Sequence, residues 1–183
     1  MRPGVLFFNR LVDARWEVWV LDNYSDPGTN ERTPDGQLMN QAKYVGNVDA
    51  ARHLSDRLAR TAVALKSQRS TFSKVEAVCA VPYFGPPRPT SVPHLLAARI
   101  ASALGVPDRS DLVRKVRATP PAKGAAAAAF APDQFEVNWT TSERRVLLVD
   151  DVYRTGGTFA SLAVSLRSAN LSAVAGIAAV RAT

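Results

Sequence analysis

The chain is poor in cysteine and lacks the common nucleotide-binding signatures. Cys79 is the only cysteine among 183 residues, which excludes an intrachain disulfide and a cysteine-based zinc cluster. Its neighbours are apolar, so we expect Cys79 to be a small buried hydrophobe and not a nucleophile. Neither the G-x-G-x-x-G pattern of dinucleotide loops nor the G-x-x-x-x-G-K-[ST] pattern of nucleoside-triphosphate loops occurs.

Long hydrophobic runs are also missing. No apolar run approaches the roughly 20 residues that span a membrane. The few apolar residues after Met1–Gly4 are too short a run for a signal-peptide core. We therefore expect a cytoplasmic protein with no membrane association. Hydrophobic residues make up 46% of the chain, which suits one domain over residues 1–183 with a sizeable core.

Acidic residues are fewer than basic ones, and the net charge is +7. Such a charge suits either a polyanionic small ligand or a nucleic-acid surface. The basic residues are spread along the chain, apart from a modest cluster at Arg109, Arg114, Lys115 and Arg117. No basic motif with interleaved aromatic residues stands out, so we predict only weak, non-specific nucleic-acid binding.

The most informative stretch is 146–158. Val146–Val149 form a short apolar run, which is typical of a parallel strand covered on both faces. Asp150 and Asp151 follow, and Thr155–Thr158 open a segment with helical spacing. Glycines allow close backbone approach, and the N–H groups of a new helix attract anions. The pattern predicts a phosphate site, with two carboxylates that take ribose hydroxyls or a hydrated magnesium ion.

A second stiff loop follows the strand predicted at Val75–Val81. It contains several prolines and glycines together with Arg88, which can donate to two phosphate oxygens at once. Ser91 then caps a helix predicted over Val92–Leu104, with Gly105 as its stop. A loop that ends in a helix start is a second candidate anion site, although a rigid surface turn is the alternative.

The stretch at 146–158 resembles the phosphoribosyl-pyrophosphate motif of type I phosphoribosyltransferases. The resemblance implies that the two acids contact the ribose, and face Mg²⁺ through water, while the following loop holds the 5'-phosphate. It implies a pyrophosphate loop after the earlier strand. The implied substrate-binding residues are Tyr83, Phe84, Gly85, Arg88, Asp150, Asp151, Arg154, Thr155, Gly156, Gly157 and Thr158.

From about Lys43 onward, the order of motifs resembles the ComF-like, competence-associated branch of that family. The R-A-T-P-P-A-K-G text from Arg117 corresponds to a flexible lid over residues 117–133, in which Lys123 reaches the pyrophosphate. Asp150, Asp151, Arg88 and Lys123 are the implied catalytic residues. An amino-terminal cysteine module and an arginine-rich stretch after Gly124, both usual in the branch, are missing.

The remaining patterns complete an α/β fold. Strands are predicted at 5–8, 15–21, 111–116 and 173–180, the second of them half-exposed, with a loop over 23–36 and a helix from Asn47. His53 lies beside that helix's apolar stripe, and nothing near it in sequence orients it as a base. Strands alternating with helices predict a parallel sheet flanked by helices, with ligands at the carboxyl ends of the strands. The resemblance implies that this sheet is type I phosphoribosyltransferase-like.

The resemblance implies transfer of ribose 5-phosphate from phosphoribosyl pyrophosphate to a nitrogen nucleophile. A nucleotide monophosphate is then the product-side ligand, and a small hood built from residues 1–45 recognises the base. The alternative is a non-catalytic sensor of phosphoribosyl pyrophosphate or nucleotide, or a partner- or nucleic-acid-binding module, on the same fold. The sequence allows a homodimer and leaves the acceptor open.

Overall fold

A computed structural model describes residues 6–9, 16–85, 91–118 and 133–182. The strands are β1 Leu6–Asn9, β2 Trp16–Asn23, β3 Ala77–Ala80, β4 Val113–Lys115, β5 Phe135–Val137, β6 Arg145–Tyr153 and β7 Ser172–Arg181. The helices are α1 Pro34–Asn40, α2 Val48–Gln68, α3 Ser70–Ser73, α4 Val92–Leu104 and α5 Gly157–Ser168, with a π-helix η1 at Gln41–Val45 and a 3-10 turn η2 at Ser110–Leu112.

The main sheet has the strand order β1-β2-β7-β6-β3. β1 pairs with β2 in antiparallel fashion, whereas β2, β7, β6 and β3 run parallel to one another. β4 and β5 form a separate antiparallel ribbon. The chain is thus an α/β protein with a mostly parallel sheet flanked by helices, as the sequence predicted.

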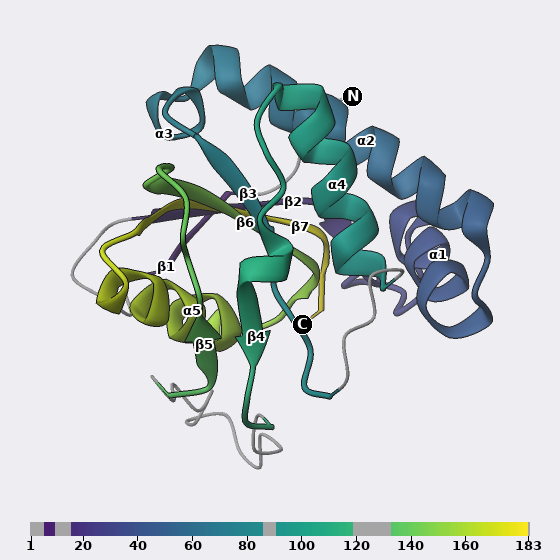
Figure 1. Cartoon of the computed structure of the whole chain (residues 1–183). Coiled ribbons are helices and arrows are strands. Elements are labelled where there is room, and N and C mark those ends of the chain that lie inside the picture. The colour runs from purple at the N-terminus through teal and green to yellow at the C-terminus, as the bar shows by residue number, and fades with distance from the viewer. Residues whose placement is uncertain (1–5, 10–15, 86–90, 119–132, 183) are drawn as a thin grey trace.

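Helices cover both faces of the sheet, as Figure 1 shows. On one face, α1, α2, α3 and α4 pack against sheet residues that include Val78, Leu147 and Ile177. On the other, α5 and the β4–β5 ribbon pack against residues that include Cys79 and Leu148. The apolar run at Val146–Val149 is fully buried because successive side chains enter these two cores in turn.

The connections that follow β3 and β6 run toward opposite sides of this strand pair. α5 covers one face and leads to β7, on one side of β6. α4 covers the other face and leads to Asp108, which bridges Val78 on the side of β3 away from β6. Neighbouring parallel strands with such diverging crossovers define a topological switch point, at which α/β proteins commonly bind ligands. The carboxyl ends of β3 and β6 therefore flank the expected crevice.

Three local predictions were wrong. Ser91 was expected to cap α4, but its side chain makes no cap hydrogen bond, and its hydroxyl lies 2.8 Å from His94 Nδ1 instead. β2 was expected to be half-exposed, but Glu17, Val18, Trp19 and Val20 are all buried, because α-helices cover one face of this internal strand and the second core covers the other. The segment 23–36 was expected to be a loop, but α1 begins within it at Pro34. The hydroxyl of Thr33 accepts from Gly36 N–H and caps this short helix.

Other predictions are confirmed. α4 has the predicted bounds, and Asn47 caps α2 by accepting from the backbone N–H groups of Asp49 and Ala50. Cys79 is fully buried, and burial raises the pKa of its thiol. Within the described ranges, no helix has the length and apolar character needed to cross a membrane.

Candidate functional site

The two neighbouring acids lie within β6, which pairs with β7 as far as Tyr153. Asp151 is buried and Asp150 is half-buried. The backbone N–H of Asp151 donates to Asp150 Oδ1 over 2.8 Å. Burial first, and then the charge of Asp151, raise the pKa of Asp150 well above its usual value. Two carboxylates are thus held together at the carboxyl end of a core strand, where ionising both is costly.

Lys43 supplies a cation to this acid pair. Its Nζ lies 2.6 Å from Asp151 Oδ2, and it comes from η1, more than a hundred residues earlier in the chain. Burial opposes the charged form of Lys43, but the charges of Asp151 and then Asp150 outweigh it and raise the pKa of the ammonium. Lys43 was not singled out as a site residue from sequence, because one lysine in a short polar segment has no distinguishing pattern.

The loop after β6 turns directly into α5. Gly156 precedes the helix with a φ of 80°, in the left-handed region that favours glycine. Because the N-cap residue is Gly156, the N-cap position supplies no side-chain acceptor to the first turn of α5. The helix start at Gly157 and Thr158 therefore offers backbone donors and the positive end of the helix dipole to an anion. Arg154 and Thr155, in the same loop, are exposed.

The second candidate loop leaves the neighbouring strand. β3 pairs with β6 in register as far as Ala80 and Val149, so Tyr83, Phe84 and Gly85 emerge at the same edge as the acids. Phe84 is 53% exposed and bridges to Lys115 of the β4–β5 ribbon. Arg88 and Lys123, the cations assigned to pyrophosphate by resemblance, lie outside the described residues, as does most of the expected lid at 117–133.

The basic cluster seen in the sequence is largely paired with carboxylates. Arg109 pairs with Glu143 over 2.7 Å, and Arg114 pairs with Glu136 over 2.6 Å. Arg117 pairs with Asp133. Lys115 is half-buried over the ring of Phe135, where burial lowers the pKa of its ammonium and the charge of Asp150 opposes that shift. The cluster therefore has less free positive charge than its sequence indicates.

The acid pair suits Mg²⁺ as a partial ligand set. Magnesium commonly takes one or two protein carboxylates and completes its shell with water and substrate phosphates. No group of three or more His, Cys, Asp or Glu side chains that could hold a metal occurs in the part of the chain that the structure describes. Asp150 and Asp151 therefore fit a metal that arrives with a phosphorylated ligand better than one held by protein alone.

A cavity of about 390 Å³ opens beside the acid pair. Its lining residues are Tyr24, Ser25, Lys43, Tyr44, Val152, Arg154 and Ala182. This volume lies within the usual range for small-molecule sites. Four of its seven lining residues come from the segment after β2 and from η1, within the stretch 1–45 that was expected to form a hood, although the sequence singled out none of them individually.

Comparisons with known proteins found distant structural likenesses. An adenine phosphoribosyltransferase from Leishmania donovani has 15% identity and a TM-score of 0.49, over 93% of this chain and 73% of that one. One from Thermoanaerobacter pseudethanolicus has 19% identity and a TM-score of 0.46, over 76% and 83%. An orotate phosphoribosyltransferase from Aeropyrum pernix has 24% identity and a TM-score of 0.39, over 73% and 59%.

No protein-family model matches the chain, and no curated protein sequence matches it. The structural likenesses are remote in both identity and TM-score, so the description of the fold rests on this chain's own strand order and crossovers.

Proposed function

We propose that the chain is a phosphoribosyltransferase that transfers ribose 5-phosphate from magnesium phosphoribosyl pyrophosphate to a nitrogen nucleophile. The observation that carries the proposal is the switch point between β3 and β6, where two loops and the acid pair meet at one edge. A ribose phosphorylated at both ends needs two anion sites with polar groups between them. The resemblance to the ComF-like branch is part of this proposal, as are the hood at 1–45 and the lid at 117–133.

Each loop has one proposed task in binding. The N–H groups at the start of α5 and the hydroxyls of Thr155 and Thr158 hold the 5'-phosphate, with Arg154 beside them. Asp150 and Asp151 accept from the ribose hydroxyls and meet Mg²⁺ through water. Residues 83–88 hold the pyrophosphate, with Arg88 as its main cationic donor.

The proposed reaction is a displacement at the anomeric carbon. The lone pair of the acceptor nitrogen forms the new bond to that carbon, while the bond to the pyrophosphate oxygen breaks and pyrophosphate leaves with the electron pair. A nitrogen that carried a proton releases it to water. Arg88 and Lys123 stabilise the negative charge that develops on the leaving group, and a closed lid keeps water from the anomeric carbon. Magnesium, when bound, adds positive charge to the pyrophosphate.

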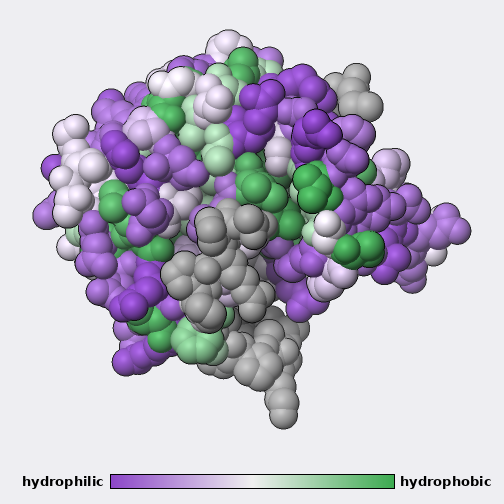
Figure 2. Space-filling model, turned by 45° about the vertical axis from the view of Figure 1, so that its right-hand side comes forward, coloured by the Kyte–Doolittle hydropathy of each residue, from purple (hydrophilic) through white to green (hydrophobic). Residues whose placement is uncertain are grey.

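A non-catalytic sensor of phosphoribosyl pyrophosphate is the second candidate. The favouring observation is the ion pair between Lys43 and Asp151, because it engages with an ammonium one of the two acids that would contact the ribose and the metal. A partner-binding module is less favoured. Figure 2 shows hydrophobic residues in small groups among hydrophilic ones on the visible face, without one broad apolar surface there.

Pyrophosphate release separates the two candidates. The full chain is mixed with magnesium phosphoribosyl pyrophosphate and a panel of heteroaromatic and amine acceptors, and released pyrophosphate is measured. Release that depends on an acceptor supports the enzyme. Thermal stabilisation by the same ligand without release supports the sensor. A result that shows no pyrophosphate release and no thermal stabilisation would contradict both the enzyme and the sensor.

A further inference from the structure

A second cavity adjoins the one beside the acid pair. It has a volume of about 560 Å³ and lies between the turn after β2 and helix α1. Its lining residues are Tyr24, Ser25, Asn30, Glu31, Arg32 and Gln37. Tyr24 and Ser25 line both cavities, so the two are neighbours that share one wall.

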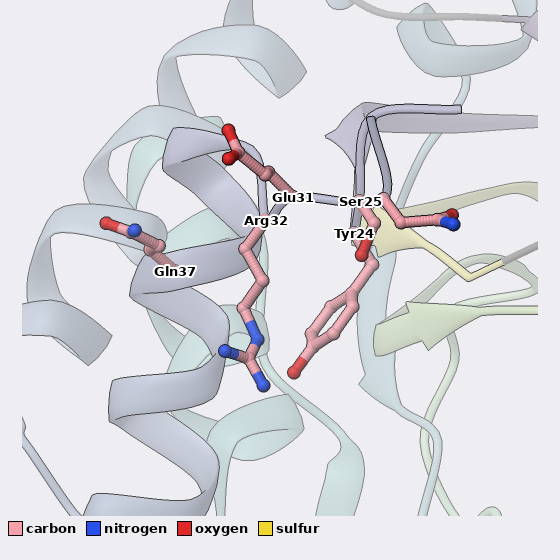
Figure 3. A pocket seen from close by; sticks show the side chains of 6 residues that line it. Tyr24, Ser25, Glu31, Arg32 and Gln37 are labelled. Carbon is pink, nitrogen blue, oxygen red and sulfur yellow. The ribbon is translucent and has the colours of Figure 1, made fainter. Parts of the chain in front are cut away.

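Arg32 is the cationic residue and Tyr24 the aromatic residue in the lining of this second cavity. Figure 3 shows the Arg32 guanidinium and the Tyr24 hydroxyl pointing to the same side, while the Glu31 carboxylate points away from both. The guanidinium carbon lies 5.8 Å from the centre of the Tyr24 ring. No carboxylate pairs with Arg32 among the described residues. Its charge is therefore available to a ligand.

The surroundings of the Tyr24 hydroxyl are electropositive. Burial opposes ionisation of Tyr24, but hydrogen bonds from Asn40 and Arg32 and the charges of Arg32 and Lys43 together lower the pKa of the phenol. The Asn40 amide donates to the hydroxyl oxygen over 3.1 Å. An oxygen-bearing anion placed in the cavity meets the Arg32 guanidinium and the Tyr24 phenol, which are both hydrogen-bond donors.

The side chain of Lys43 connects the Tyr24 hydroxyl to the acid pair. Lys43, which acts on Tyr24 electrostatically, is the residue that pairs with Asp151. A ligand that spans the shared wall would have one end beside the proposed ribose site. Its other end would lie against Arg32. The aromatic side chain of Tyr44 and the aliphatic side chain of Val152 line the route between them.

We propose that the Arg32–Tyr24 cavity binds a carboxylate group on a planar heteroaromatic acceptor, so that the acceptor is a monoanionic aromatic acid. This inference rests on the proposed function, since it names the substrate class for the same site. One guanidinium with neutral donors matches a single negative charge and offers the fork geometry that suits a carboxylate. A phosphate dianion would call for further unpaired cations, and Lys43 is already engaged by Asp151.

The backbone that shapes this cavity is fixed by close contacts. A Cβ on Gly36 would lie 1.9 Å from the carbonyl oxygen of Tyr24, so only glycine lets α1 approach the end of β2. The Thr33 hydroxyl donates to the Asn23 carbonyl over 2.5 Å. Asp35 of α1 is buried and pairs with Arg57 of α2 over 2.5 Å. The cavity is thus preformed and does not depend on ligand binding.

Matched pairs of neutral and anionic probes test the proposal. Pyridine and pyrimidine carboxylates, each with its carboxamide, are titrated by calorimetry into the full chain in the presence of ribose 5-phosphate and magnesium pyrophosphate. We expect at least one carboxylate to bind about tenfold or more tightly than its carboxamide. Arg32→Gln should remove that preference and leave carboxamide binding unchanged, and Tyr24→Phe should weaken it.

Arg60→Gln is the control, because it removes one exposed arginine from α2 and should keep the preference. Equal affinity within every pair, no binding of any carboxylate, or a preference that survives Arg32→Gln would overturn the proposal. The release assay identifies which idea has failed. Turnover with neutral acceptors alone would support the transferase function and refute the carboxylate acceptor. Arg32-dependent carboxylate binding without binding of phosphoribosyl pyrophosphate would support the proposed carboxylate site and refute the transferase function.

Discussion

The two edges of the main sheet use acidic residues in opposite ways. At the amino edge, where β3 and β6 begin, Glu76 accepts from several donors and Glu143 pairs with Arg109. At the carboxyl edge, where the same strands end, Asp150 and Asp151 lie beside each other, and Lys43 pairs with Asp151. The first arrangement stabilises the charged carboxylates, and the second raises the pKa of Asp150.

At the amino edge, contacts of Glu76 and Glu143 join β3 to β6 and to the segment that follows α4. Glu76 accepts from the backbone N–H groups of Arg144 and Arg145 over 2.7 and 3.0 Å, and these contacts lower its pKa. Glu143 pairs with Arg109, and the donors from Arg109 and then Thr141 lower its pKa to about 2. Such carboxylates favour the folded state at neutral pH.

The acids at the carboxyl edge lack part of this stabilisation of the folded state. Burial raises the pKa of Asp150 instead of lowering it, and the neighbouring carboxylate adds to the effect. A protein keeps such an arrangement where a ligand or metal supplies the missing positive charge. The contrast favours a structural task for the acids at one edge and a binding task for those at the other.

The largest expected effect comes from removing the negative charge at the carboxyl edge. Asp150→Asn with Asp151→Asn should weaken binding of magnesium phosphoribosyl pyrophosphate by about 100-fold or more, because charge-assisted contacts to ribose and metal are lost. The fold should survive, since the apolar residues of β6 make the core. Calorimetry measures the affinity, and circular dichroism checks the fold. Unchanged affinity would remove the acids from the site, and Asp111→Asn, which neutralises one exposed acid away from β6, is the control.

A smaller effect should follow from removing the internal cation. In Lys43→Met, the acid pair loses its ammonium partner, so the affinity of the free chain for Mg²⁺ should rise by about tenfold. Metal titration without substrate measures this directly. Lys74→Met removes an exposed lysine at the other edge of the sheet and should leave the affinity unchanged. A Mg²⁺ affinity that stays constant or falls in Lys43→Met would mean that Lys43 does not compete with the metal.

At the amino edge, a stability change is expected without a binding change. Glu143→Gln should lower the free energy of unfolding by about 1 kcal/mol at pH 7. For a chain of this size, that loss corresponds to a fall in Tm of about 2–4 °C.

The effect should also depend on pH. Because the folded-state pKa of Glu143 is lowered to about 2, its contribution is present above the ordinary glutamate pKa and disappears as the pH falls toward about 2. Wild-type and variant stabilities should therefore converge in acid, as measured by denaturant unfolding across that range. Glu31→Gln serves as the control, and a difference that persists at pH 2 would contradict the assigned cause.

The smallest expected effect concerns nucleic acid. Three of the four basic residues in the cluster are paired with carboxylates, which reduces the net positive charge that the cluster offers to phosphates. We expect duplex DNA to bind no tighter than about micromolar at physiological salt, with a shallow salt dependence. Band-shift titrations at two salt concentrations measure both. Tight, selective binding that survives physiological salt would favour the binding-module alternative.

Local patterns predicted the elements whose determinants are local. The apolar run before Asp150, the Ser91–Gly105 bounds of α4 and the Asn47 cap each depend on neighbouring residues, and the structure contains them. Long-range packing decided the rest. The burial of β2 depends on helices that follow it, and the short ribbon partner β5 has only three residues of pattern.

The acid pair could be found from sequence because it directly follows its strand. The cavity residues Tyr24, Arg32 and Lys43 could not, because η1 and the turn before α1 reach the site only through tertiary contacts. The Pro, Gly and Asp residues of 23–36 are typical of loops, so the sequence did not predict the helix that begins at Pro34.

The π-helical turn at Gln41–Val45 has a consequence for how the site can change. A π turn contains one residue more than the equivalent α turn, and α1 runs into it without a break. Deleting Val45 from η1 would return the segment to α geometry and rotate the side chains before it by roughly 100° relative to those after it. Lys43 would then point away from Asp151 even though it remained in the sequence. The position of this lysine is therefore set by the length of the chain as well as by its amino acids, and a change of one codon in length would reach the acid pair without altering any residue that lines it.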